Sequence, residues 1–264
     1  MTVVELRDRE AIAAFCRRRP GAHAYALGDL DDFFWPHTRW WAWKPGNEIE
    51  QLVLLYTEPD PPVILAIAEE PTSSMESLLR ELNPELPRDL YAHVTPDCLP
   101  ALAGDREVVD GGWLHHKLSV DTNDLPEPTT AEKSADLRLL GPDALDEVEA
   151  FYRHAYPGTW FVPRMLETRR YLGLMLGGEL ASIAGVHVYS PTWNAAALGN
   201  VATLPAHRGR GVGKTVCLAL CRILAADGIR TISLNVKADN APALAVYRAL
   251  GFGTAVDYVE ALMR

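Results

Sequence analysis

The stretch that decides the fold is "HRGRGVGKT", residues 207–215. It ends in the tripeptide Gly-Lys-Thr, like the Gly-x-x-x-x-Gly-Lys-Thr loop with which many proteins bind nucleotide phosphates. In that loop the first glycine stands five places before the second, but here that place holds Arg208, and Gly209 comes one residue too late. Because the loop wraps phosphate with successive backbone N–H groups, one missing residue shortens the ring of donors. The spacing therefore argues against an ATP site of this kind.

The same loop is nevertheless suited to phosphate, because of the secondary structure expected around it. An apolar stretch ending near Thr203 predicts a strand, and apolar residues at helical spacing predict a helix over about residues 212–228. The glycines between them let the backbone approach a ligand closely. Exposed N–H groups and the helix dipole favour an anion there, and Arg208, Arg210 and Lys214 add positive charge. These residues predict a pyrophosphate site.

Two motifs in this order resemble the signatures of the GNAT superfamily of CoA-dependent N-acyltransferases. The superfamily's pyrophosphate motif, Arg/Gln-x-x-Gly-x-Gly/Ala, is similar to "RGRGVG" at residues 208–213. Its second signature is similar to "LNVKADNAPALAVYRALGF" at residues 234–252, where Asn235, Asn240 and Tyr247 fall at the family spacings. The resemblance covers residues 136–264 and implies an N-acetyltransferase that uses acetyl-CoA as the acyl donor.

The resemblance also implies which residues bind the cofactor. A short run of the strand before the loop would pair with the pantetheine arm of CoA like an added strand. A backbone N–H there would polarise the thioester carbonyl as negative charge builds on its oxygen. The expected cofactor-binding residues are Val201, Ala202, Thr203, Arg208, Gly209, Arg210, Gly211, Val212, Gly213, Lys214, Thr215, Asn235 and Asn240.

Tyr247 is the expected catalytic residue. It lies seven residues after Asn240, which can cap the helix that follows, so the two side chains share a helix face. CoA leaves as a thiolate, and a phenol with a pKa of about 10 stays protonated at neutral pH and can donate a proton to it. The alternative is that the ring packs under the helix and its hydroxyl only forms a hydrogen bond.

The acceptor amine is not readable from the sequence. "HAYPGTWFVPR", residues 154–164, lies where GNAT proteins wall the acceptor site, so Tyr156, Trp160 and Phe161 are candidate substrate contacts, with packing as the alternative. His187, on the preceding strand, is either a core histidine or a residue that reaches the acceptor. A small amine, an amino acid, an aminoglycoside, a peptide N-terminus and an aminated thiol precursor all stay open. The cofactor strand offers no carboxylate, so no general base is assigned.

The first half of the chain repeats the element order of the second. The ends of the halves align without a gap in "HVTPDCLPALAG" (93–104) and "NVKADNAPALAV" (235–246). The first half carries "AEEPTSS" (68–74) in place of the phosphate loop, and its two acids would repel phosphate, so no cofactor is expected there. The sequence predicts an α/β (α+β) fold of two tandem GNAT-like domains, each a mixed, mostly antiparallel sheet flanked by helices. The expected bounds are 1–121 for a degenerate domain, 122–135 for a linker and 136–264 for the catalytic domain.

Composition narrows the remaining function classes. The chain has 264 residues, a net charge of −10, four cysteines without a CxxC pair, and no apolar run of membrane length. The acidic balance argues against nucleic-acid binding, although residues 136–264 hold 13 basic and 11 acidic residues and so favour a polyanion. We expect a cytoplasmic protein without a metal or membrane partner, acting on a small-molecule or peptide amine; its oligomeric state stays open. A non-catalytic acyl-CoA-binding module and a P-loop-like ATP-dependent phosphotransferase remain as alternatives.

Overall fold

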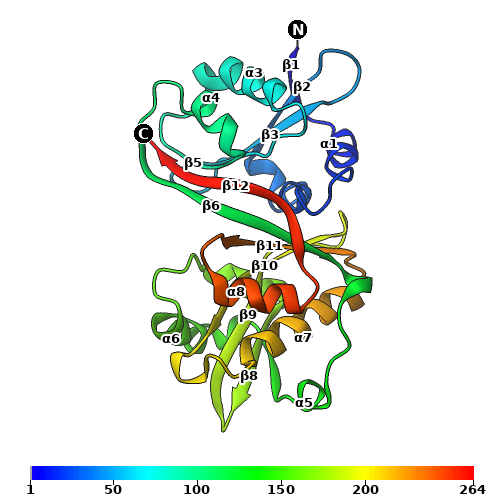
Figure 1. The fold of residues 1–264 in the computed structure, drawn as a ribbon, viewed down its shortest axis with the longest axis vertical. Helices are drawn as coiled ribbons and strands as arrows, with labels where there is room; N and C mark the ends of the chain where they lie inside the picture. The colour runs from blue at the N-terminus through cyan, green and yellow to red at the C-terminus, as the bar shows by residue number, and fades with distance from the viewer. Residues whose placement is uncertain (1) are drawn as a thin grey trace. The chain divides into compact units, whose positions relative to one another are not determined.

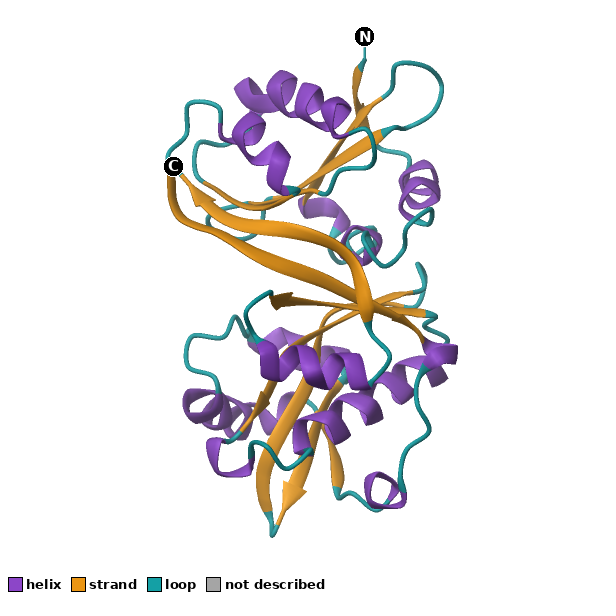
Figure 2. Ribbon diagram, in the orientation of Figure 1, coloured by secondary structure: helices purple, strands orange, loops and turns teal. Residues whose placement is uncertain are grey.

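The computed structural model describes residues 2–264, which form two compact units. The first unit takes the chain up to Lys117 together with Val236–Asn240 and Thr254–Arg264, and the second takes Leu118–Asn235 and Ala241–Gly253. Each unit is therefore made of segments that are not continuous in sequence, and the last residues of the chain belong to the same unit as the first. Figure 1 labels the elements of both units, and Figure 2 colours them by type.

The first unit is built on a mixed sheet. Pairing is antiparallel along its first four strands and becomes parallel between the fourth and the fifth. Its strands lie in the order β1 (Val3–Leu6), β2 (Thr38–Trp43), β3 (Gln51–Tyr56), β4 (Val63–Ala66), β5 (Leu90–Val94), β12 (Gly253–Met263) and β6 (Val108–Asp121). Its helices are α1 (Arg9–Cys16), α2 (Ala24–Gly28), α3 (Thr72–Leu82) and α4 (Leu99–Ala103).

Local sequence explains the helices of the first unit. Asp8 caps α1, because its carboxylate accepts hydrogen bonds from two backbone N–H groups of the first turn. In α3, Met75, Leu78, Leu79 and Leu82 recur at helical spacing and are buried in the core of this unit. The apolar face of α3 thus covers the sheet, while its other face stays polar.

The second unit repeats this plan. Its sheet is antiparallel except for one parallel pair at β10–β11. Its strands lie in the order β11 (Thr231–Lys237), β10 (Ala195–Thr203), β9 (Glu179–Ser190), β8 (Tyr171–Leu176) and β7 (Leu137–Leu140). Its helices are α5 (Thr130–Lys133), α6 (Leu145–Ala155), α7 (Val212–Ala226) and α8 (Ala241–Ala249). The helix α7 packs on β8, β9 and β10.

The two units share one topology. In each, the long helix α3 or α7 connects a pair of parallel strands, β4 to β5 in the first unit and β10 to β11 in the second. The strand before each pair is antiparallel to it. The predicted fold class, a tandem of mixed α/β layers with mostly antiparallel sheets, is confirmed.

The expected domain bounds differ from the contact units because the last strand of the chain, β12, belongs to the first unit together with most of β6. Strand β12, from the end of the second half, pairs with β5 from Val94↔Val259 to Leu90↔Met263 (Figure 1). Strand β6, from the end of the first half, lies next to β12 and passes into the second unit at Leu118. At Gly111 of β6 (φ 113°) an added Cβ would overlap the backbone of Glu260 in β12, so only glycine fits this approach.

The segment expected as a linker belongs to the second unit. Thr129 and Glu132 form a capping box, in which each side chain accepts from the other's backbone N–H, and they start α5. Arg222 of α7 donates to the carbonyl of Pro126 and forms an ion pair with Glu127. Residues 122–135 thus lie along α7.

Candidate active site

Strands β10 and β11 separate in the middle of the second unit. Within residues 2–264 their parallel pairing runs from Ala195↔Thr231 to Leu198↔Leu234 and ends there. On its other edge β10 stays paired with β9 as far as Thr203, with register shifts after Ala197 and after Gly199. The end of β10 therefore presents one strand edge that β11 does not cover. An extended ligand can pair with such an edge as an added strand.

Asn200 lies at the second of these register shifts, a bulge in β10 between Gly199 and Ala202. Its φ of 54° is in the left-handed region, which asparagine tolerates better than most residues. Its side chain accepts from Thr159 (2.9 Å) and donates to the hydroxyl of Tyr171 (2.9 Å), and its carbonyl accepts from the Tyr152 hydroxyl (2.7 Å). Burial raises the pKa of both phenols, so they stay protonated as donors. This network was not predicted from the sequence, although a Gly-Asn pair inside an apolar strand is a signal for a bulge.

The glycine loop leads directly into α7. Gly209 (φ 74°) and Gly211 (φ 78°) both have left-handed backbones, and a Cβ on either would meet only open space. Gly211 is the N-cap of α7 and makes no side-chain cap, so the first turn relies on other acceptors for its N–H groups. At Gly213 a Cβ would lie 3.0 Å from Thr203 Oγ1, so glycine lets the helix start close to β10. The loop is shaped to expose backbone N–H groups at a helix N-terminus.

The cationic side chains of the loop have partners within the protein. Arg208 donates to the carbonyl of Thr203 (3.0 Å) and to that of Ala155 (2.9 Å), which ties the loop to β10 and α6. Lys214 Nζ lies 3.1 Å from Glu132 Oε1. Arg208 and Lys214 were expected to face a phosphate. In the structure each of them also contacts a neighbouring helix, α6 for Arg208 and α5 for Lys214.

Three further loop residues make local contacts. Arg210 lies 3.3 Å from Nδ1 of His207, and Thr215 donates from Oγ1 to the carbonyl of Gly211 (3.2 Å). Val212, the first residue of α7, is buried. The side chain of Val212 is thus part of the helix packing, and the hydroxyl of Thr215 supports the first turn of α7.

Residues of the second motif lie beyond the point of strand separation. Asn235 follows Leu234, the last paired residue of β11, and Asn240 directly precedes α8. Tyr247 lies on α8 with 8% of its surface exposed, and its ring centroid is 5.9 Å from that of Phe252. The packing alternative for Tyr247 thus has a structural basis, and the acid role stays a prediction.

The aromatic residues expected near the acceptor divide into two groups. Phe161 packs on the core, with its ring centroid 5.2 Å from that of Tyr152. Tyr156 and Trp160 are exposed, and the Trp160 ring meets His187 edge-on at 5.6 Å. Phe161 therefore packs in this structure, while Trp160 and His187 form an aromatic pair next to β10.

Comparisons with known proteins identify the family. The acetyltransferase (GNAT) family profile matches residues 141–252. The [ribosomal protein bS18]-alanine N-acetyltransferase of Escherichia coli (strain K12) is 30% identical over 139 residues, which are 52% of this chain and 80% of that protein. The chain belongs to the acetyltransferase (GNAT) family. Its match spans the glycine loop, the separated strands and α8.

Other GNAT relatives match a smaller share of their own length. The mycothiol acetyltransferase of Amycolatopsis mediterranei (strain U-32) is 36% identical over 155 residues, 51% of this chain and 51% of that protein. The chain thus spans about half the length of this relative. Among solved structures, a Drosophila protein has a TM-score of 0.69 at 14% identity, covering 100% of this chain and 98% of its own. A tandem GNAT protein from the clavulanic acid pathway has a TM-score of 0.50 at 19% identity, covering 99% and 96%. These structures support the fold alone.

In the first unit, residues 68–74 stand in the place of the glycine loop, and backbone N–H groups in this segment have partners within the protein. Its backbone N–H groups at Ala68 and Glu69 donate to the side chains of Thr95 and Gln51, both at 2.8 Å. Although burial alone would raise the pKa of the Glu69 carboxyl, hydrogen bonds from His23 and Arg19 hold it below its usual value. The donors of this loop are thus used within the protein.

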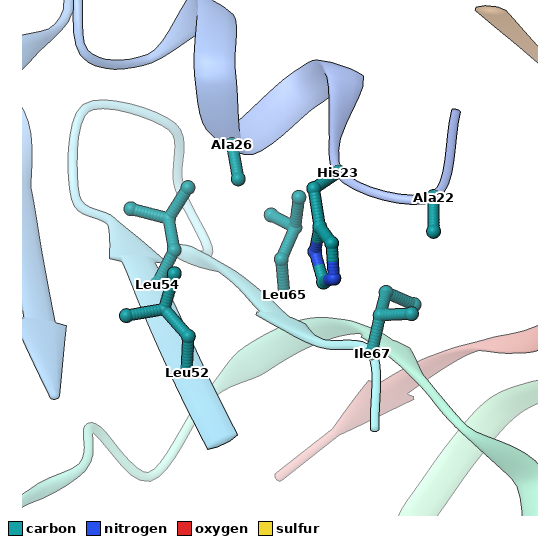
Figure 3. A pocket seen from close by; sticks show the side chains of 7 residues that line it. All are labelled: Ala22, His23, Ala26, Leu52, Leu54, Leu65 and Ile67. Atoms are coloured by element: carbon teal, nitrogen blue, oxygen red, sulfur yellow. The ribbon is translucent and has the colours of Figure 1, made fainter. Parts of the chain in front are cut away.

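A small cavity lies in the same unit (Figure 3). It has a volume of about 10 Å³, which is room for about one water molecule. Apolar side chains surround the imidazole of His23, and the lining residues are Ala22, His23, Ala26, Leu52, Leu54, Leu65 and Ile67. A cavity of this size holds no nucleotide or amine substrate.

The described part of the chain shows no features of a metal site, a membrane-spanning helix or a reactive thiol. Within residues 2–264 no group of three His, Cys, Asp or Glu side chains is arranged to hold a metal ion. None of the described helices is both long enough and apolar enough to cross a bilayer. The four cysteines are buried free thiols, and burial raises the pKa of Cys217 to about 12, which keeps it protonated and unreactive.

Proposed function

We propose that this protein is an N-acetyltransferase that transfers an acetyl group from acetyl-CoA to an amine by direct attack. The observation that carries the proposal is the uncovered edge of β10 beside an exposed-glycine loop at the start of α7. A strand edge suits the amide-containing pantetheine arm, and a helix N-terminus suits the pyrophosphate. Both features lie in the segment that matches the GNAT family.

The chain's own residues fit this ligand. The backbone of Val201–Thr203 would pair with the pantetheine arm, and the loop at residues 208–213 would surround the pyrophosphate with N–H groups. Side chains are missing where the loop is most open, at Gly209 and Gly211, so the backbone can approach phosphate. The helix dipole of α7 adds partial positive charge at the same place.

Acetyl-CoA supplies an activated thioester. The residues of the chain hold the acceptor nitrogen near the thioester carbon, so that the C–N bond forms and the C–S bond breaks. A backbone N–H at the end of β10 stabilises the charge that develops on the carbonyl oxygen. Tyr247 donates a proton to the departing sulfur, as the family motif implies.

The acceptor is proposed only as a class, a small-molecule or peptide amine. Relatives carry the names of a mycothiol acetyltransferase and of an acetyltransferase for an alanine of a ribosomal protein. The exposed Tyr156 and Trp160 offer apolar surface beside the cofactor strand, so an acceptor with an apolar portion fits best. The buried free cysteines are compatible with the cytoplasm that we propose as its location.

One set of measurements tests the function against its alternatives. Calorimetry compares acetyl-CoA, CoA and ATP, and thioester loss is then followed with L-alaninamide, L-cysteinamide and kanamycin as acceptors. Acetyltransfer predicts CoA binding without ATP binding, together with turnover of at least one amine. Binding of CoA with no turnover on a broad amine panel would favour a non-catalytic acyl-CoA-binding module. Tight ATP binding instead of CoA would favour a phosphotransferase.

A further inference from the structure

A histidine lies at an irregularity in the strand next to β10. Ala197 pairs with Val188 and Leu198 pairs with Val186, so β9 has one residue more than β10 between these pairs. That residue is His187. An extra residue of this kind bends the strand and redirects its side chain.

The imidazole of His187 lies directly over the backbone of β10. A Cβ built on Gly199 would overlap its ring, and the φ of Gly199 is not in the left-handed region, so glycine serves here to make space rather than a turn. Gly199 precedes Val201 by two residues, within the register shift of β10 between Gly199 and Ala202. A thioester bound at Val201 would therefore lie next to the backbone that the ring of His187 contacts.

Trp160, the other neighbour of His187, faces solvent, whereas Nε2 of the imidazole is buried. The ring of Trp160 meets the imidazole edge-on, with an interplanar angle of 77°, and 54% of Trp160 is exposed. A tryptophan held by its edge leaves a ring face open for contact with an apolar or cationic group. The two side chains thus border one partly open space beside the cofactor strand.

We propose that His187 is the base that takes the proton from the acceptor amine, and that Trp160 contacts the acceptor's carbon skeleton. This inference rests on the proposed acetyltransfer. The N–H bond of the ammonium group breaks, its electron pair stays on nitrogen, and the proton moves to a ring nitrogen of His187, directly or through one water. The neutral amine then forms the C–N bond with the thioester carbon.

The surroundings suit this role. A neutral imidazole carries a lone pair on one ring nitrogen, and that nitrogen can accept a proton from an amine or from a water. Two titratable groups from neighbouring elements, Tyr152 of α6 and Tyr171 of β8, hold Asn200 next to Gly199. Burial raises the pKa of both, so they stay neutral over the assay range and do not add charge beside His187.

The test compares wild type with His187→Gln, using L-alaninamide, L-cysteinamide or kanamycin, whichever the wild type acetylates fastest. We expect kcat/KM to fall about 10²-fold and the acid limb of its profile between about pH 6 and 9 to disappear, as loss of a general base requires. With hydrazine as the acceptor, which is largely unprotonated at the upper end of this range, the fall in kcat/KM should be much smaller. His37→Gln, which changes an exposed histidine of the first unit, is the matched control and should behave as wild type. Calorimetry with CoA checks that each variant retains its folded cofactor site.

A second substitution, at Gly199, moves the imidazole of His187 without replacing it. Gly199→Ala displaces the imidazole, so it should reduce turnover in the wild-type background but add little to His187→Ala, a coupling that a double-mutant cycle measures. Wild-type rates and an unchanged pH profile in His187→Gln would overturn the inference and leave acetyltransfer intact. If the wild-type protein acetylates none of these amines or hydrazine, the proposed function fails, and the inference fails with it.

Discussion

Lys214 and Glu132 form an ion pair beside the first turn of α7, with Nζ 3.1 Å from Oε1. The carboxylate belongs to the capping box of α5, and only 10% of its side chain is exposed. The hydrogen bond from the backbone N–H of Thr129 is the largest effect on Glu132, and with the help of Lys214 it holds the pKa of this carboxyl below its usual value. The negative charge of Glu132 thus lies next to the loop that we propose binds pyrophosphate. It pairs with Lys214, one of the cations expected to face the phosphate.

Glu132→Gln should therefore strengthen CoA binding. Glutamine keeps the capping box but removes the charge, which frees Lys214 for phosphate. A partly exposed ion pair contributes up to about 1 kcal/mol, so we expect the dissociation constant for CoA to fall about two- to fivefold at low salt. The gain should shrink as added salt screens the charges. Calorimetry across a salt series measures both effects.

Glu127→Gln is the control for this prediction. Glu127 lies in the same segment and also pairs with α7, through Arg222, but two turns further along the helix. If both variants improve CoA binding equally, a general loss of negative charge explains the gain, and the specific competition at Lys214 is wrong.

Gly211 tests the phosphate loop itself. Its φ of 78° strains any side chain, and its missing Cβ faces open space where phosphate would approach. Gly211→Glu adds a carboxylate there, whereas Gly211→Asn adds a neutral side chain that tolerates the same backbone. We expect Glu to weaken CoA binding at least about tenfold more than Asn, a difference of about 1.4 kcal/mol. Equal affinities of the two variants in calorimetry would place the pyrophosphate elsewhere.

The second half of the fold was predictable because its signals are local. Apolar residues at helical spacing predicted α7, and Asn240 as a helix cap predicted the helix that begins at Ala241. The place of β12 in the first unit was not predictable, because an apolar strand carries no local record of its partner. In the structure the carboxylate of Glu260 in β12 accepts hydrogen bonds from Tyr91 of β5 and from Tyr258 of β12 itself. A fragment starting at residue 136 would separate β12 from β5.

Of the candidate site, the glycine loop could be predicted from the sequence, but the contacts of its side chains could not. Glycine spacing in the loop depends on backbone conformation alone, and the left-handed angles of Gly209 and Gly211 agree with it. The partners of Arg208 and Lys214 come from α6 and α5, far away in sequence, so no pattern could assign them. The same holds for the ring of His187 over Gly199, which depends on a shift in strand register.

Lys117 makes the stability of the first unit depend on pH. Its side chain is fully buried, with Nζ 4.2 Å from the ring centroid of Tyr25, and burial lowers its pKa to about 7 against the attraction of Glu260 and Asp29. An unfolded lysine has a pKa of about 10.4. Between these values the folded state binds fewer protons than the unfolded state, so the stability that Lys117 contributes rises with pH and is lost as pH falls toward 7.

Lys117→Met should remove this dependence. Asp29 acts in the same direction, because burial raises its pKa to about 7 and loss of the lysine charge would raise it further. The stability difference, wild type minus variant, should therefore grow from about pH 7 to 9, by up to ~1.4 kcal/mol per pH unit. Urea unfolding followed by tryptophan fluorescence reports mainly on this unit, which holds five of the seven tryptophans. Lys44→Met, a partly exposed lysine of the same unit, should leave the slope unchanged, and a flat difference for Lys117→Met would contradict the assignment.

Tyr247 offers the most direct test of the chemistry. Its ring is largely buried beside Phe252, and the backbone N–H of Phe252 donates to its carbonyl, so the ring position is fixed by the end of α8. Tyr247→Phe keeps the ring and this packing but removes the proton. If the phenol protonates the departing CoA sulfur, turnover should fall about 10²-fold while CoA affinity and the melting temperature change little.

The measurement must isolate the chemical step, because slow product release would hide the loss. Single-turnover rates with enzyme in excess over acetyl-CoA meet this need. Tyr189→Phe removes a phenol that accepts from Arg170 on the surface of the same unit, and it should retain wild-type rates. A Tyr247→Phe enzyme with a wild-type single-turnover rate would leave the hydroxyl a packing contact only. Loss of CoA affinity together with turnover would instead assign Tyr247 to cofactor binding, since a proton donor to the leaving sulfur acts after the cofactor is bound.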